Sequence, residues 1–215
     1  MINEIAKISA AAVISLTTQF ISPLSTENVL STREISLENR YPVKSVSDVF
    51  RDNILLNLSY MDGKVSGKKD IKWDEVTKPF TMEFRLEPGR TFAYHDDVLP
   101  QYKNTLTKTT QAHFNAQEGF KTDGHLYGDG VCHLASLIYW VAKDANLDAT
   151  APTRHDFMNI PEIAKEHGVS IYSNPNAKGA NAKQNLYVTN NKSKTVAFKF
   201  DYDGVNLKVS AVELN

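Results

Sequence analysis

The segment that most constrains the fold is residues 131–146, where apolar side chains recur at helical spacing. The apolar stripe consists of Val131, Leu134, Ala135, Ile138, Ala142 and Ala145. Side chains three, four and seven positions apart share one face of an α-helix. The stripe therefore predicts an amphipathic helix that packs this face on another element. The glycine-rich turn Gly128-Asp129-Gly130 precedes the helix and marks its beginning.

Several segments around this helix carry strand patterns. Residues 80–86 alternate apolar and polar side chains, as a half-buried strand does. The turns at 190–194 and at Asp203-Gly204 predict hairpins between C-terminal strands. Further strands are expected over 53–60, 169–172, 185–189, 195–200 and 207–212, and short helical segments over 45–50 and 160–168. These patterns predict an α+β fold in which an antiparallel sheet packs on one dominant helix that starts at Cys132.

The length of 215 residues fits one domain with an N-terminal extension. Residues 1–22 hold a short apolar run, which we interpret as a signal peptide or, alternatively, as a membrane-proximal helix. Residues 23–45 are rich in polar side chains and predict a linker or arm. Residues 46–215 then form a single globular domain, because 41% of the chain is hydrophobic and 23% is charged.

The charge pattern argues against nucleic acid as a partner. The formal net charge is −1, so no bulk attraction to phosphate is expected. A short lysine-rich run is interpreted as a solvated surface; it holds Lys64, Lys68, Lys69 and Lys72. The sequence has no glycine-rich phosphate loop and no dinucleotide fingerprint, so no cofactor is expected.

Cys132 is the only cysteine, so the chain forms no internal disulfide. A thiol at a helix start ionises more readily, because unpaired N–H groups and the helix dipole favour negative charge. Cys132 is therefore a candidate nucleophile, with His155 as general base and Asp156 or Asp129 as the group that orients the imidazole. The alternative is that Cys132 fills the core as a small apolar side chain.

A metal site is a further alternative. Zinc accepts one thiolate together with imidazoles, and the candidate ligands are Cys132, His133, His125, His113 and His155. Their spacings match no standard zinc signature. We therefore expect no metal.

The order of several motifs resembles the VanW family. The motifs are Pro88-Gly89-Arg90-Thr91-Phe92-Ala93-Tyr94, Glu118-Gly119-Phe120, Gly128-Asp129-Gly130-Val131-Cys132-His133, Arg154-His155 and Asn185-Leu186-Tyr187-Val188-Thr189-Asn190. The resemblance covers about residues 85–212, and this chain has His133 where the family usually has glutamine. It implies a bacterial cell-envelope protein, extracytoplasmic and either secreted or membrane-anchored through residues 1–22, although a cytoplasmic location stays open.

Two functions follow as alternatives. The first is a cysteine-dependent acyl transferase or hydrolase acting on peptidoglycan peptides, with Cys132, His155, Asp156 and His133 as catalytic residues. The second is a non-catalytic module that binds a cell-wall polymer or peptide stem. Its sugar-stacking and hydrogen-bonding side chains are taken from Phe92, Tyr94, Tyr127, Asp129 and Arg154, the last of which pairs with a carboxylate. No protein partner is inferred.

Overall fold

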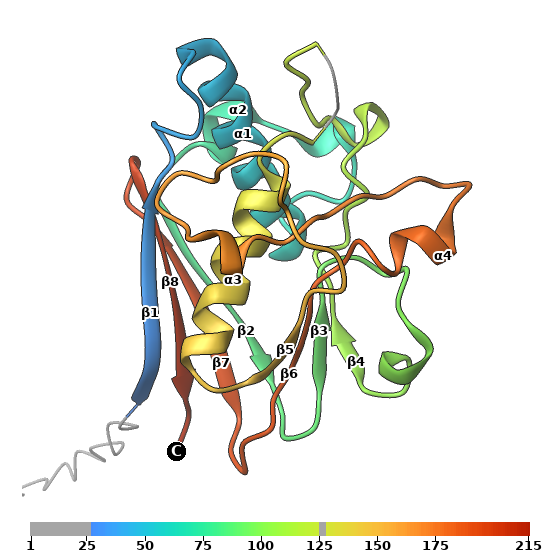
Figure 1. Cartoon of the computed structure of the whole chain (residues 1–215). Coiled ribbons are helices and arrows are strands. Elements are labelled where there is room, and N and C mark those ends of the chain that lie inside the picture. Colours follow the sequence, from blue (N-terminus) through green and yellow to red (C-terminus); the bar gives the residue numbers. More distant parts are fainter. Residues whose placement is uncertain (1–26, 125–127) are drawn as a thin grey trace, which may run out of the picture.

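Two four-stranded sheets and two long helices dominate the computed structural model, which describes residues 27–124 and 128–215 (Figure 1). The strands are β1 (Asn28–Ser36), β2 (Phe80–Leu86), β3 (Thr91–Ala93), β4 (Leu106–Lys108), β5 (Asp148–Thr150), β6 (Tyr187–Thr189), β7 (Val196–Tyr202) and β8 (Asn206–Glu213). The α-helices are α1 (Lys44–Met61), α2 (Trp73–Val76), α3 (Val131–Asp144) and α4 (Lys178–Asn181). Short 3₁₀ turns are η1 (Lys68–Asp70), η2 (Pro100–Tyr102), η3 (Ala116–Glu118) and η4 (Lys165–His167).

The first sheet has the order β1-β8-β7-β2 and is antiparallel throughout. The second has the order β4-β3-β6-β5, with β3 and β4 as its one parallel pair. Helix α3 packs on β1 and β8 of the first sheet and on β5 of the second (Figure 1). The predicted α+β class is therefore confirmed, although the strands form two sheets.

The core between the sheets is aromatic. The ring of Phe84 on β2 stacks 4.9 Å from Phe92 on β3 and 5.1 Å from Phe198 on β7. All three side chains are buried. These contacts join strands from both sheets, and burying such rings supplies much of the free energy that holds the sheets together.

The predicted helix at 131–146 is confirmed as α3, but it begins at Val131, so Cys132 is its second residue. Gly130 precedes it with a φ of 99°. A Cβ at this position would lie 2.5 Å from the backbone oxygen of Phe50, so only glycine fits between the turn and α1. The helix is also not the single dominant one, because α1 is longer.

The expected strand over 53–60 was wrong, because these residues belong to α1. Every residue from 52 to 61 is buried, including the polar Asn53 and Asn57, so the run shows no division into an apolar and a polar helical face. Such a run fits a buried strand and a buried helix equally well. The helix also absorbs the turn expected over 45–50.

The expected linker over 23–45 was wrong for residues 28–36, which form the edge strand β1 paired with β8. Most side chains of this edge strand are polar and face solvent. The sequence therefore lacks the apolar alternation that would predict a strand. The remaining N-terminal residues, including the predicted signal peptide or helix at 1–22, lie outside the described residues.

The C-terminal strands β6, β7 and β8 are confirmed, and the turn at Asp203-Gly204 joins β7 to β8 as predicted. The turn at 190–194 makes no hairpin, because β6 pairs with β3 and β5 in the other sheet. Asn190 holds this turn by donating hydrogen bonds to Leu86 O and Lys194 O, each at 2.8 Å. The expected helix over 160–168 contains only η4, and the expected strand over 169–172 only a bridge between Val169 and Arg154.

Candidate functional site

The start of α3 is anchored by buried amide and phenol side chains. Asn57 on α1 donates a hydrogen bond to the Tyr94 hydroxyl at 2.5 Å, and that hydroxyl donates to Val131 O at 3.0 Å. Asn53 on α1 donates to Asp129 O at 2.9 Å. These bonds fix the glycine-rich turn, and with it the first turn of α3, against α1 and the end of β3.

Cys132 is half-buried against the core, and its sulfur faces the backbone of Ile171. The sulfur accepts from Ile171 N at 3.4 Å and lies 3.7 Å from Ile171 O. Burial raises the pKa of the thiol to about 11; the Ile171 hydrogen bond opposes this change and the charge of Asp129 adds to it. The thiol is therefore neutral at neutral pH, and the helix-start effect expected from the sequence is outweighed by desolvation.

His133 lies inside the protein, with 2% of its surface exposed. Its ring centroid is 5.0 Å from Phe50 and 6.4 Å from His155, and its Nδ1 has no hydrogen-bond partner among the described residues. Burial lowers the pKa of His133 to about 3, and the charges of Arg40 and His155 lower it further. A buried imidazole with this pKa is a weak base and is uncharged at neutral pH.

His155 is buried and its Nδ1 donates to Met158 O at 3.2 Å. Burial lowers the pKa of this ring, and the hydrogen bond to Met158 partly offsets that effect. No hydrogen bond joins Cys132 to His155 or to His133 in the part of the chain that the structure describes. Asp156 is exposed. The structure thus brings His133 and His155 together but does not form the expected thiol–imidazole pair.

The residues expected to bind a ligand divide between interior and surface. Phe92 and Tyr94 are fully buried, so their rings are not accessible to a sugar. Asp129 is half-buried, and its Oδ2 accepts from Asp123 N at 3.4 Å. Arg154 is exposed. Tyr127 lies outside the described residues, as does His125.

An exposed aromatic residue that the sequence did not single out as a ligand residue follows Arg154 by three positions in the chain. Phe157 is 76% exposed, and its ring centroid lies 4.1 Å from that of His155. Met158 next to it is also exposed. The available signal was an apolar pair inside an otherwise polar stretch between two prolines, 152 and 161.

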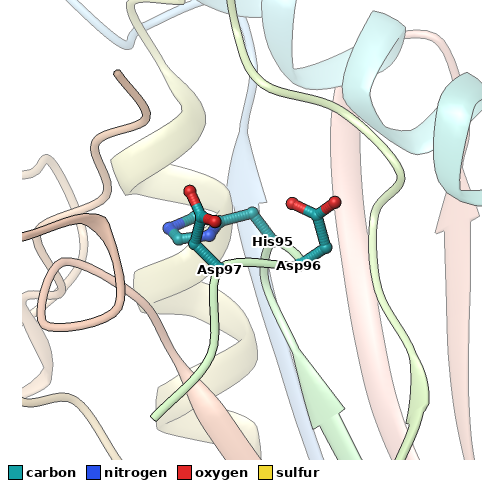
Figure 2. A group of neighbouring side chains, drawn as sticks. All are labelled: His95, Asp96 and Asp97. Atoms are coloured by element: carbon teal, nitrogen blue, oxygen red, sulfur yellow. The ribbon is translucent and has the colours of Figure 1, made fainter. Parts of the chain in front are cut away.

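A second polar cluster, His95, Asp96 and Asp97, begins two residues after the end of β3 (Figure 2). One ligand atom from each residue lies within 4.8 Å of the other two. His95 is 1% exposed, Asp97 is half-buried and Asp96 is exposed. Burial lowers the pKa of the His95 ring. The signal for this cluster in the sequence was an unbroken run of three ligand-type residues near a strand end.

Together, the glycine-rich turn, the cysteine in the first turn of α3 and the terminal strands define a VanW-like α+β domain. A family model described as VanW like protein matches residues 81–212. Because this match covers more than half of the chain, the protein belongs to the VanW family. No curated protein matches the chain, and no solved structure does. Across residues 27–124 and 128–215, no helix has the length and apolar character needed to cross a membrane.

Proposed function

We propose that this VanW-family domain is a binding module for a polymer of the bacterial cell envelope, and that it contacts the polymer through residues 154–158. The observation that carries the proposal is the exposed ring of Phe157 packed on His155. An aromatic face that is both exposed and held in place can stack on a sugar ring at little entropic cost. Phe157 thus takes the place of Phe92 and Tyr94, which were expected from the sequence to stack on sugars but are buried.

Arg154 supports the same proposal. Its side chain is exposed and forms no ion pair with any described residue. A guanidinium binds a carboxylate through two parallel hydrogen bonds, and peptide stems of the wall carry carboxylates. A ligand of this kind implies an extracytoplasmic location, which is part of the proposal.

The alternative is a cysteine-dependent acyl transferase or hydrolase acting on peptidoglycan peptides. The position of Cys132 in the first turn of α3 favours it, because the N–H groups there suit a developing negative charge. The thiol is neutral and no base among the described residues is hydrogen-bonded to it, and both observations favour the binding module instead.

The test measures co-sedimentation of the purified protein with peptidoglycan sacculi. Phe157→Ala and Arg154→Gln are each expected to weaken binding at least about tenfold, since removing an anchoring contact costs about 1.4 kcal/mol or more. The matched control Val43→Ala, which also trims an exposed apolar side chain, leaves binding unchanged. Wild-type binding by Phe157→Ala overturns the proposal. Release of peptide fragments by the wild type but not by Cys132→Ala establishes the enzyme alternative.

A further inference from the structure

We propose that His95, Asp96 and Asp97 form a binding site for one divalent transition-metal ion (Figure 2). The site would supply one imidazole nitrogen and two carboxylate oxygens. This mixed nitrogen and oxygen set suits zinc or manganese, whereas calcium prefers oxygen ligands alone. Three protein ligands leave a position for water or for an added ligand.

The hydrogen bond on the far side of the ring fixes the tautomer of His95. His95 Nε2 lies 3.0 Å from Gln184 O, and a carbonyl oxygen only accepts, so Nε2 carries the proton. The lone pair is therefore on Nδ1. A metal-binding histidine characteristically donates its other ring N–H to such a carbonyl or carboxylate, which fixes the tautomer and the ring.

The lone pair on Nδ1 accepts a hydrogen bond from Asn185 Nδ2, an amide group that also donates to two other acceptors. Its neighbour is Asn185 Nδ2 at 3.3 Å, but that group lies closer, at 3.1 Å each, to His95 O and Asp97 O. An amide NH₂ has two hydrogens and here faces three acceptors. The longest of the three contacts falls on Nδ1, so a metal ion bound there would displace only the weakest of the three hydrogen bonds.

The two carboxylates are each held by one oxygen. Asp97 Oδ2 accepts from Asn181 Nδ2 at 2.6 Å, and Asp96 Oδ1 pairs with His113 Nε2 at 3.0 Å. The second oxygen of each has no hydrogen bond to a described residue. Ligands bound at 2.0–2.2 Å lie at most about 4.4 Å apart, so a small rotation of the exposed Asp96 side chain completes the site.

The experiment is calorimetric titration of the chelator-treated full chain with Zn²⁺, and separately with Mn²⁺ and Ca²⁺. We expect one Zn²⁺ per chain, with Asp96→Asn and Asp97→Asn each binding it at least about tenfold more weakly. Asp96 is exposed, so thermal melting of Asp96→Asn without metal should match the wild type and separate ligand loss from misfolding.

Two controls exclude other sites. Asp74→Asn removes an exposed carboxylate on α2, and Cys132→Ala removes the thiol; both are expected to bind Zn²⁺ as the wild type does. Unchanged binding by both Asp96→Asn and Asp97→Asn overturns the proposal, as does loss of binding in Cys132→Ala. Tighter binding of Ca²⁺ than of Zn²⁺ or Mn²⁺ overturns the assignment to a transition metal.

Discussion

The start of α3 and the segment 154–158 touch through His133 and His155, yet their surroundings are opposite. His133 is enclosed, and Cys132 is tied to the backbone of Ile171. Two positions beyond His155, Phe157 presents most of its ring to solvent. The comparison shows that nearness to a family motif does not make a residue available to a ligand. In this protein the glycine-rich turn and Cys132 are part of the packed structure, which we call the framework. The neighbouring segment 154–158, apart from the buried His155, presents its side chains to solvent.

The largest expected effect is on the framework side. Gly130→Ala should lower the free energy of unfolding by about 3 kcal/mol or more, because a Cβ would meet Phe50 O at 2.5 Å and the φ of 99° is strained for alanine. Gly89→Ala is the matched control: its φ is also positive, at 73°, but nothing lies within 4 Å of the added Cβ. Its cost should be about 1 kcal/mol. Equal losses in urea denaturation would contradict the close packing of the turn on α1.

Regular patterns explain what the sequence predicted well. The helix α3, the strand β2 and the hairpin of β7 and β8 carry clear periods or turn signals, so their existence followed from local sequence. The second half of helix α1 and strand β1 were missed because the first is buried on every side and the second is a polar edge strand. Neither sequence pattern distinguishes a helix from a strand or a loop unless the elements that pack against the segment are known.

The candidate site was less predictable because its chemistry depends on distant segments. The position of Cys132 near a helix start followed from the sequence, but Ile171 faces its sulfur from 39 residues away. The low pKa of His133 depends on burial and on Arg40, and the metal-type cluster at His95 depends on Asn181, Gln184 and Asn185. Only the folded arrangement brings these groups together.

The thiol of Cys132 should react slowly in the native protein. A pKa of about 11 instead of 9.0 lowers the thiolate fraction at pH 7.5 about 100-fold, and the thiolate is the reactive form. Iodoacetamide labelling followed by mass spectrometry should therefore be about 100-fold slower in buffer than in urea. The native rate should also keep rising with pH up to about pH 11. Native labelling that is as fast as labelling in urea would instead place Cys132 among activated thiols and revive the enzyme alternative.

The buried state of His133 predicts a loss of stability in mild acid. Its pKa is about 3 in the folded state and about 6.5 in the unfolded chain, so below pH 6.5 the unfolded state binds a proton that the native state refuses. The free energy of unfolding should fall by about 2 kcal/mol from pH 7 to pH 5. His133→Gln removes this titrating ring, and the remaining loss then comes from groups such as His155 and His95, whose pKa values burial also lowers. Urea titration at pH 7 and pH 5 measures the free energy of unfolding of both proteins. An equal fall in wild type and His133→Gln would contradict the assignment of this loss to His133.

The smallest expected effect on stability belongs to Phe157. Because the ring is 76% exposed and contacts, among the described aromatic rings, only that of His155, Phe157→Ala should change the free energy of unfolding by less than about 0.5 kcal/mol. The same substitution is expected to weaken binding to sacculi at least about tenfold. A stability loss above about 2 kcal/mol would show that Phe157 serves the core, and the contrast between the framework and the segment 154–158 would then disappear. Loss of binding without loss of stability is the combination that only a ligand-contacting residue produces.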